Sequence, residues 1–106
     1  MNFEYCTITT TTDDPTIAEL ITKALLESQL VACVQSSKIQ SQYKWENKVV
    51  NTNEIMLRMK SKCVLYKNVE TKIKALHNYE VPQIVMIPII NANQAYLEWI
   101  DAQVIH

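Results

Sequence analysis

Apolar and polar residues alternate in two neighbouring segments of the chain, which is the pattern of half-buried strands. Over residues 39–46 the larger side chains share one face. These side chains are Ile39, Tyr43 and Trp45. The chain reverses at Asn47, and residues 54–60 alternate again. We therefore expect an antiparallel hairpin over residues 31–60.

The length of this hairpin constrains where its aromatic residues lie. A first arm running unbroken over residues 31–46 spans about 50 Å at about 3.3 Å per residue. A domain of this size is about 34 Å across, for a radius of gyration of about 13 Å. Either the hairpin projects and exposes Tyr43 and Trp45 to a partner, most simply a second copy of the chain, or it bends and buries both in its own core.

Helical spacing of apolar residues replaces alternation in two further segments. Asp14, followed by a proline, is expected to cap a helix that ends near Ser28 or Gln29. Ser61 is expected to cap the next helix, whose apolar stripe extends over residues 65–76.

Two apolar segments and a terminal helix complete the pattern. Residues 3–11 are rich in β-branched and aromatic residues and predict a first strand. The continuous apolar run over residues 83–90 predicts a strand covered on both faces, although Pro88 favours an edge strand or a bulge. Asn93 is expected to cap a last helix over residues 95–105.

This order of elements predicts a single α+β domain over residues 1–106. Strand, helix, strand, strand, helix, strand is the ferredoxin-like split βαβ sandwich, here with a long hairpin and an extra C-terminal helix. Helices would cover one face of the sheet. The other face would carry Ile, Val, Tyr and Trp side chains with nothing to cover them, which is a second argument for an oligomer.

Composition excludes several classes of function. The formal net charge of −1 provides no general electrostatic footprint for nucleic acid or an anionic membrane. The chain has no glycine, so phosphate-binding loops of the Walker or Rossmann type are excluded. We expect asparagine in the turns instead, at Asn47, Asn51, Asn53, Asn78, Asn91 and Asn93. No membrane-spanning segment or secretory signal is apparent, which predicts a cytoplasmic protein.

The three cysteines agree with a reducing compartment. They are odd in number, far apart and form no CxxC pair, so neither a disulfide framework nor a zinc knuckle is predicted. We expect Cys6, Cys33 and Cys63 to act as small buried hydrophobic residues.

Six short motifs occur in order along the chain. They are Thr11 with Asp14; Leu30-Val31-Ala32-Cys33; Tyr43-Lys44-Trp45-Glu46-Asn47-Lys48; Glu54 with residues 57–60; His77, Tyr79, Glu80 and Pro82; and Tyr96, Leu97 and Trp99. As a set they resemble the T-x-x-D, L-A-A-C, Y-x-W-x-G-K, L-x-x-K, H-x-Y-E-x-P and Y-L-x-W motifs of the CutA family, also called divalent-cation tolerance proteins.

The resemblance implies a homotrimer, similar in architecture to the PII signalling proteins, in which the long hairpins contribute to the contacts between subunits. It also implies a non-catalytic role in the response to divalent metals such as copper, and copper binding in some members, with no cofactor required. The alternative is a PII-like signalling or scaffold module that binds a small molecule or a partner protein in the clefts between subunits.

The chain departs from the family pattern at four places. Asn47 replaces the glycine of the hairpin tip, and a glycine before the last helix is replaced within residues 91–93; asparagine can supply the same backbone geometry. Thr10 stands where some members have a cysteine proposed as a copper ligand, and Leu76 stands where they have a second histidine.

His77, Tyr79 and Glu80 form the densest polar cluster, on a turn after a helix. Imidazole and carboxylate suit copper or zinc, but two ligands are fewer than a stable site uses, so the rest would come from a neighbouring subunit or water. Cys6, on the same strand face as Thr10, is a third candidate ligand. In the alternative, His77 caps the helix, Glu80 pairs with Lys60, and Cys6 packs in the core.

A second group of residues is expected at a cleft or interface between subunits. The group comprises Tyr43, Trp45, Glu54, Lys60, Tyr79 and Trp99. The simpler alternative for them is interface packing with a salt bridge between subunits. No acid, base and oxyanion donor can be assembled from the pattern for a named reaction, so an enzyme is not predicted.

Overall fold

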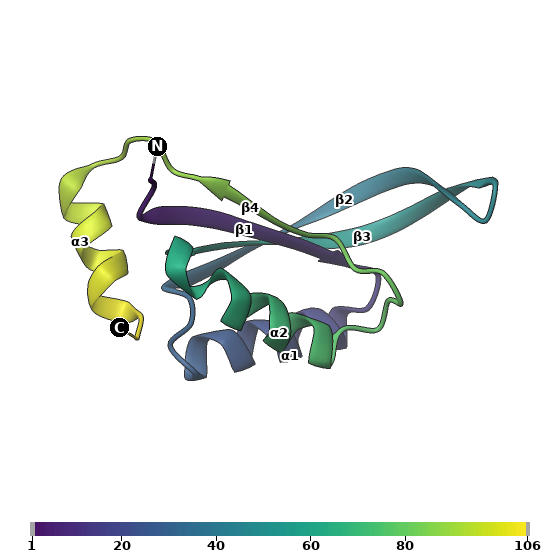
Figure 1. Ribbon diagram of the computed structural model, residues 1–106. Helices are drawn as coiled ribbons and strands as arrows, with labels where there is room; N and C mark the ends of the chain where they lie inside the picture. Colours follow the sequence, from purple (N-terminus) through teal and green to yellow (C-terminus); the bar gives the residue numbers. More distant parts are fainter. Residues whose placement is uncertain (1, 106) are drawn as a thin grey trace.

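The computed structural model describes residues 2–105 and contains one four-stranded antiparallel sheet in the order β2-β3-β1-β4. The elements are β1 (Tyr5–Thr12), α1 (Pro15–Glu27), β2 (Cys33–Trp45), β3 (Lys48–Lys62), the 3₁₀ turn η1 (Cys63–Leu65), α2 (Tyr66–Leu76), β4 (Ile84–Pro88) and α3 (Gln94–Gln103). Helices α1 and α2 lie side by side against one face of the sheet, and α3 packs at one end (Figure 1). The predicted ferredoxin-like split βαβ fold is confirmed.

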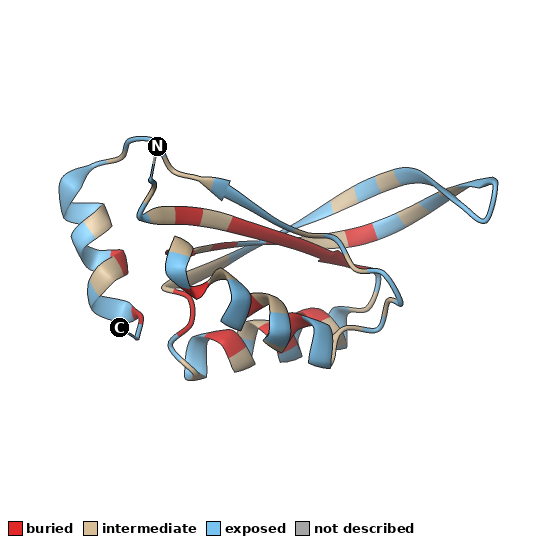
Figure 2. Ribbon diagram, viewed as in Figure 1, coloured by how far each residue is buried: buried red, intermediate tan, exposed pale blue. Residues whose placement is uncertain are grey.

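The core lies between the sheet and the helices α1 and α2. The register of β1 and β3 places Ile8 opposite Met59 and Thr10 opposite Leu57, all on the face toward the helices. Each of these four side chains is at most 1% exposed. Ile21, Leu25, Val69 and Ile73 cover them from the helices. The buried positions follow β1 and the inner sides of both helices (Figure 2).

The hairpin of β2 and β3 projects beyond this core (Figure 1). The two strands pair as far as Trp45 and Lys48, whereas β1 pairs with β3 only over residues 55–62. The molecule therefore measures 44 × 28 × 22 Å, with a Cα radius of gyration of 14.4 Å. Tyr43 and Trp45 are 39% and 43% exposed. The projection is confirmed, and burial of both aromatic side chains in the core of their own protomer is wrong.

The hairpin closes in a two-residue turn with positive φ at both positions, 50° at Glu46 and 65° at Asn47. This is the backbone of a type I′ turn, whose twist matches that of the strands. Asn47 is thus a turn residue as predicted. Asn51 and Asn53 are not, because the ladder with β2 continues through both of them and β3 begins at Lys48.

Helix α1 begins and ends close to its expected positions. Asp14 Oδ1 accepts a hydrogen bond from Thr16 N at 2.9 Å, so this cap is confirmed. At the other end Leu30 N donates to Leu25 O and Gln29 N donates to Leu26 O, each at 3.1 Å. This is a Schellman arrangement in which Gln29, with φ of 57°, occupies the left-handed position usually held by glycine.

The expected caps of the other two helices have opposite outcomes. Ser61 is wrong as a cap: it lies within β3, is fully buried, and donates from Oγ to Leu30 O at 2.6 Å. The strand extends past it to Lys62, and α2 is entered through η1 without a side-chain cap. Asn93 is confirmed, because its Oδ1 accepts from Ala95 N and Tyr96 N.

Strand β4 is an edge strand, as Pro88 indicated. Within one protomer the strand is not covered on both faces, because Val85 and Ile87 are 41% and 55% exposed. Both point to the sheet face opposite α1 and α2, and the chain lays no helix over them. Within residues 2–105, no helix is long and apolar enough to cross a membrane.

Candidate functional site

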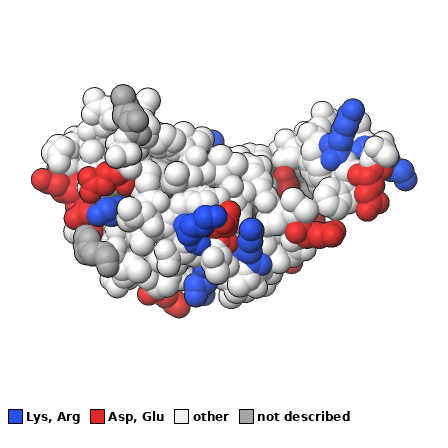
Figure 3. All heavy atoms as spheres, viewed as in Figure 1, with Lys and Arg blue, Asp and Glu red and all other residues white. Residues whose placement is uncertain are grey.

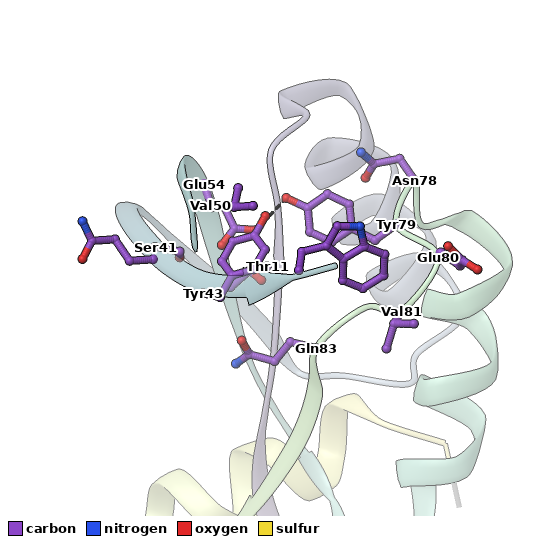
Figure 4. A pocket seen from close by; sticks show the side chains of 12 residues that line it. Thr11, Ser41, Tyr43, Val50, Glu54, Asn78, Tyr79, Glu80, Val81 and Gln83 are labelled. Carbon is purple, nitrogen blue, oxygen red and sulfur yellow. Dashed lines mark hydrogen bonds between the residues drawn. The ribbon is translucent and has the colours of Figure 1, made fainter. Parts of the chain in front are cut away.

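A cavity of about 540 Å³ lies between the projecting hairpin and the loop that follows α2. We call it the hairpin pocket. Its lining comprises Thr11, Ser41, Gln42, Tyr43, Trp45, Val50, Glu54, Asn78, Tyr79, Glu80, Val81 and Gln83. Figure 4 shows Tyr43, Glu54 and Tyr79 lying together between the hairpin and the loop. The space-filling view is hollowed between the body of the molecule and the hairpin (Figure 3).

Strand alternation explains why the sheet residues face this pocket. Tyr43 is opposite Val50, and Glu54 is opposite Ile39, on the face away from α1 and α2. Thr11 of β1 lies on the same face. The pocket is therefore built on the side of the sheet that has no helix.

Two hydrogen bonds of Asn78 anchor the loop at the edge of the pocket. Its Oδ1 accepts from Thr12 Oγ1 at 2.6 Å, and its Nδ2 donates to Asp13 Oδ1 at 2.9 Å. Asn78 was predicted only as a turn residue. Its place between a helix end and the Tyr79-Glu80 pair was the available signal, but the partners that give it a role lie 65 and 66 residues away in the sequence.

Tyr79 and Glu54 form the strongest polar contact in the pocket. Tyr79 Oη donates to Glu54 Oε2 at 2.6 Å, the length typical of a hydroxyl bound to an ionised carboxylate. Glu54 is only 6% exposed, so it depends on such a donor. Burial raises the pKa of the Tyr79 hydroxyl well above its usual value, and the bond to Glu54 and the charge of Asp13 raise this pKa further. Tyr79 therefore remains a donor at neutral pH.

His77 ties the end of α2 to β1 with both of its ring nitrogens. Nε2 lies 2.8 Å from Thr11 O, and since a carbonyl only accepts, Nε2 carries the proton. Nδ1 accepts from Tyr79 N at 2.9 Å. The ring also contacts that of Tyr79, with centroids 4.8 Å apart. Neither nitrogen has a free lone pair for a metal in this arrangement.

Cys6, the third candidate ligand, lies at the other end of β1. It pairs with Ser61 and Pro88, five residues and about 17 Å along the strand from Thr11, which His77 contacts. Cys6 is fully buried, and burial, together with the neighbouring Cys63, raises its pKa to about 12, which disfavours the thiolate that binds metals. Among residues 2–105, no three His, Cys, Asp or Glu side chains gather as a metal site. Residues 2–105 of one protomer therefore do not fit a metal.

Thr10 is the residue for which the family resemblance implied a cysteine in some members. It is fully buried, and its Oγ1 has no hydrogen-bond partner in the described part of the chain. This hydroxyl is enclosed by the core side of the sheet, opposite Leu57 and Ile84.

The remaining predicted residues divide into two groups. Tyr43, Trp45, Glu54, Tyr79 and Glu80 do come together, all within one protomer. Lys60 and Trp99 do not join them. Lys60 Nζ donates to Gln35 Oε1 at 3.2 Å instead of pairing with Glu80, and Trp99 stacks on Tyr96 of the same helix, with ring centroids 5.7 Å apart.

Comparison with known proteins shows one consistent family. Residues 6–103 match the family model described as CutA1 divalent ion tolerance protein. The divalent-cation tolerance protein CutA of Thermus thermophilus is 39% identical over 85 residues, which cover 79% of this chain and 82% of that protein. The protein of the same name from Archaeoglobus fulgidus is 38% identical, covering 82% of this chain and 85% of that protein.

Solved structures agree in fold. The CutA1 structure from the psychrotrophic bacterium Shewanella sp. SIB1 superposes with a TM-score of 0.93 at 34% identity, covering 98% of each chain. The Archaeoglobus fulgidus structure, described as a periplasmic divalent cation tolerance protein, has a TM-score of 0.91 at 34% identity and covers 93% of this chain and 97% of that one. Because residues 6–103 match the family model, the chain belongs to the CutA1 divalent ion tolerance family.

Proposed function

We propose that this chain acts as a homotrimeric, non-catalytic divalent-cation tolerance protein. The observation that carries the proposal is the match of residues 6–103 to the family of that description. The chemistry of the pocket agrees with it: Glu54, its buried carboxylate, is bound to a tyrosine and not to a Ser, Cys or His nucleophile. A cytoplasmic location belongs to the same proposal, supported by the free state of all three cysteines.

Two unlike edges of the sheet support a cyclic assembly. β2 and β4 are the outer strands, and each presents backbone groups that a neighbouring copy can pair with. A contact between two different surfaces generates a ring when the rotation from one copy to the next closes, and an open filament when it does not. Tyr43, Trp45, Val85 and Ile87 are 39–55% exposed and would be covered in the ring. The proposal of three subunits in this ring comes from the family resemblance.

Any direct metal site in this proposal would lie at a boundary between subunits. His77 and Glu80 are the ligands that one protomer offers there, and His77 would have to give up its bond from Tyr79 N or its bond to Thr11 O. The other ligands would come from a neighbouring subunit or from water. Cys6 would stay in the core.

The test is a titration of the purified protein with Cu²⁺ and Zn²⁺, with its mass in solution measured alongside. The comparison is with His77→Ala and, as a matched control, Glu46→Ala at the exposed tip. A trimer that binds an integral number of ions, with binding lost only in His77→Ala, supports direct ligation. A trimer whose weak binding does not depend on His77 excludes direct ligation there, and a monomer at micromolar concentration overturns the assembly.

A second candidate function is the binding of a small molecule in the hairpin pocket, as in a PII-like module. The observation that favours it is the pocket itself, which has the volume of ordinary ligand sites and brings aromatic and acidic side chains together.

A further inference from the structure

The lining of the hairpin pocket is acidic. Glu54 and Glu80 are among its twelve side chains, and no lysine, arginine or histidine is. Asp13 adds a third negative charge, held beside the pocket by Asn78 and close enough to Tyr79 to raise the pKa of its hydroxyl. A ligand of this pocket that carries a charge is therefore a cation.

Glu54 has an unused acceptor. Its Oε2 takes the bond from Tyr79, while its Oε1 accepts no hydrogen bond from any residue between 2 and 105. Among the described residues, Glu54 Oε1 is not one of the buried polar atoms that lack a partner, so it is open to the pocket and a donor that enters the pocket can bind it. An ammonium or guanidinium group carries such donors.

Three aromatic side chains also line the pocket, namely Tyr43, Trp45 and Tyr79. The faces of such rings attract cations, and organic cations with weakly hydrated charge benefit most. Figure 4 shows the Tyr43 and Tyr79 side chains at the same hollow as Glu54. A hydrated divalent metal fits less well, because it needs several oxygen ligands and no cluster of three acidic or metal-binding side chains occurs in the structure as described.

We propose that the hairpin pocket binds an organic cation, with an alkylammonium or guanidinium group lying against the rings of Tyr43, Trp45 and Tyr79 and donating to Glu54. This inference deepens the second candidate function and does not depend on metal tolerance. The cationic group belongs either to a free small molecule or to a lysine or arginine of a neighbouring copy.

The test uses calorimetric titration of the full chain, in its native assembly, with agmatine, which carries both groups. Glutarate and n-butanol serve as the anionic and neutral probes. Glu54→Gln removes the charge while its amide oxygen can still accept the Tyr79 bond, and Glu46→Gln removes a carboxylate at the tip as a control. We expect saturable agmatine binding, weakened about tenfold or more in Glu54→Gln and in Tyr43→Leu but unchanged in Glu46→Gln.

The outcomes separate the two sources of the cation. Agmatine binding with this dependence supports a free ligand. If agmatine does not bind but Glu54→Gln, unlike Glu46→Gln, dissociates the assembly, the pocket already holds a basic side chain of a neighbouring copy, and cation recognition is still supported. The proposal is overturned if glutarate or n-butanol binds as well as agmatine, or if Glu54→Gln changes neither binding nor assembly. Zn²⁺ binding that needs Glu54 while agmatine fails to bind also overturns it. Metal titration of His77→Ala tests the tolerance proposal separately.

Discussion

The two halves of strand β3 are alike in backbone and opposite in burial. Both pair in register with β2. In the tip half, residues 48–53, no side chain is buried, and Val49 is 72% exposed. In the base half, residues 54–62, Leu57 and Met59 are at most 1% exposed. The difference arises because only the base half is also paired with β1 and covered by α1 and α2.

This contrast shows that the hydrogen bonding of a strand to its neighbour and the burial of its side chains contribute separately to stability. An isolated two-stranded ribbon is marginally stable in water, so the tip half depends on contacts that its own protomer does not supply. Glu54 marks the boundary, since it is the first buried residue on the way from the tip to the base. The predictions below test each side of that boundary, beginning with the largest expected effect.

In the base half, Leu57→Ala is expected to lower the free energy of unfolding by about 3 kcal/mol, because it leaves a cavity in the core. The matched tip variant, Val49→Ala, is expected to change it by less than about 0.5 kcal/mol. Denaturant unfolding at one fixed protein concentration measures both. Equal losses in the two variants would mean that the tip is packed as tightly as the base.

At the tip, Trp45→Ala is expected to weaken the proposed assembly by about 2 kcal/mol per interface, because large aromatic side chains dominate such contacts. Circular dichroism of the protomer should stay unchanged, since Trp45 lies outside the protomer's core cluster. Sedimentation over a range of concentrations provides the measurement. An unchanged dissociation midpoint would show that the hairpin tip takes no part in the assembly.

At the boundary, Tyr79→Phe is expected to lower the free energy of unfolding by about 1.5 kcal/mol, because Glu54 loses its donor while remaining buried. Tyr66→Phe is the matched control. Tyr66 Oη donates to Glu70 at 2.9 Å, and the Glu70 carboxylate is more exposed than that of Glu54. Its cost should be below about 1 kcal/mol. Thermal unfolding of the unaltered chain and the two variants measures both effects. Equal losses in the two variants would contradict a special role of Tyr79 in supporting buried Glu54.

The hydrogen bond between Tyr79 and Glu54 also predicts how stability changes at alkaline pH. The pKa of Tyr79 is raised in the folded protein above its usual value of 10.0. Its contribution is therefore complete below pH 10 and is lost as the pH rises through the folded pKa. The stability difference between the unaltered chain and Tyr79→Phe should shrink above pH 10, which unfolding curves at pH 8, 10 and 11 would reveal. A difference that grows with pH would contradict the raised pKa.

The smallest expected change in stability concerns two fully buried threonines of β1, Thr10 and Thr12. Thr12 Oγ1 donates to Asn78 and accepts from Asp14 N, so Thr12→Val should cost about 1 kcal/mol. Thr10 Oγ1 has no partner in the described structure, so Thr10→Val should be neutral or stabilising by up to about 1 kcal/mol. The two variants serve as controls for each other in denaturant unfolding. A loss in Thr10→Val as large as that in Thr12→Val would indicate a hidden partner of Thr10.

The sequence by itself determined the order of elements and the antiparallel hairpin, because these depend on local periodicity. Its length left two alternatives, a projecting hairpin or a bent one, and the structure decided for projection. It also indicated five of the twelve residues that line the pocket, namely Tyr43, Trp45, Glu54, Tyr79 and Glu80. It did not indicate the boundaries near Ser61 or the left-handed backbone at Glu46 and Gln29. There the surrounding strands and helix end impose the conformation, and local preference does not reveal it.

Only the tertiary structure decided which candidates meet. Cys6 and Lys60 seemed close to His77 and Glu80 in the pattern of motifs, but the antiparallel register places them at the far end of the sheet. His77 likewise looked like a ligand until its two ring nitrogens were found bonded to the backbone. The physical reason is the same in each case: register and hydrogen-bond partners are set by residues tens of positions away, which no local pattern encodes.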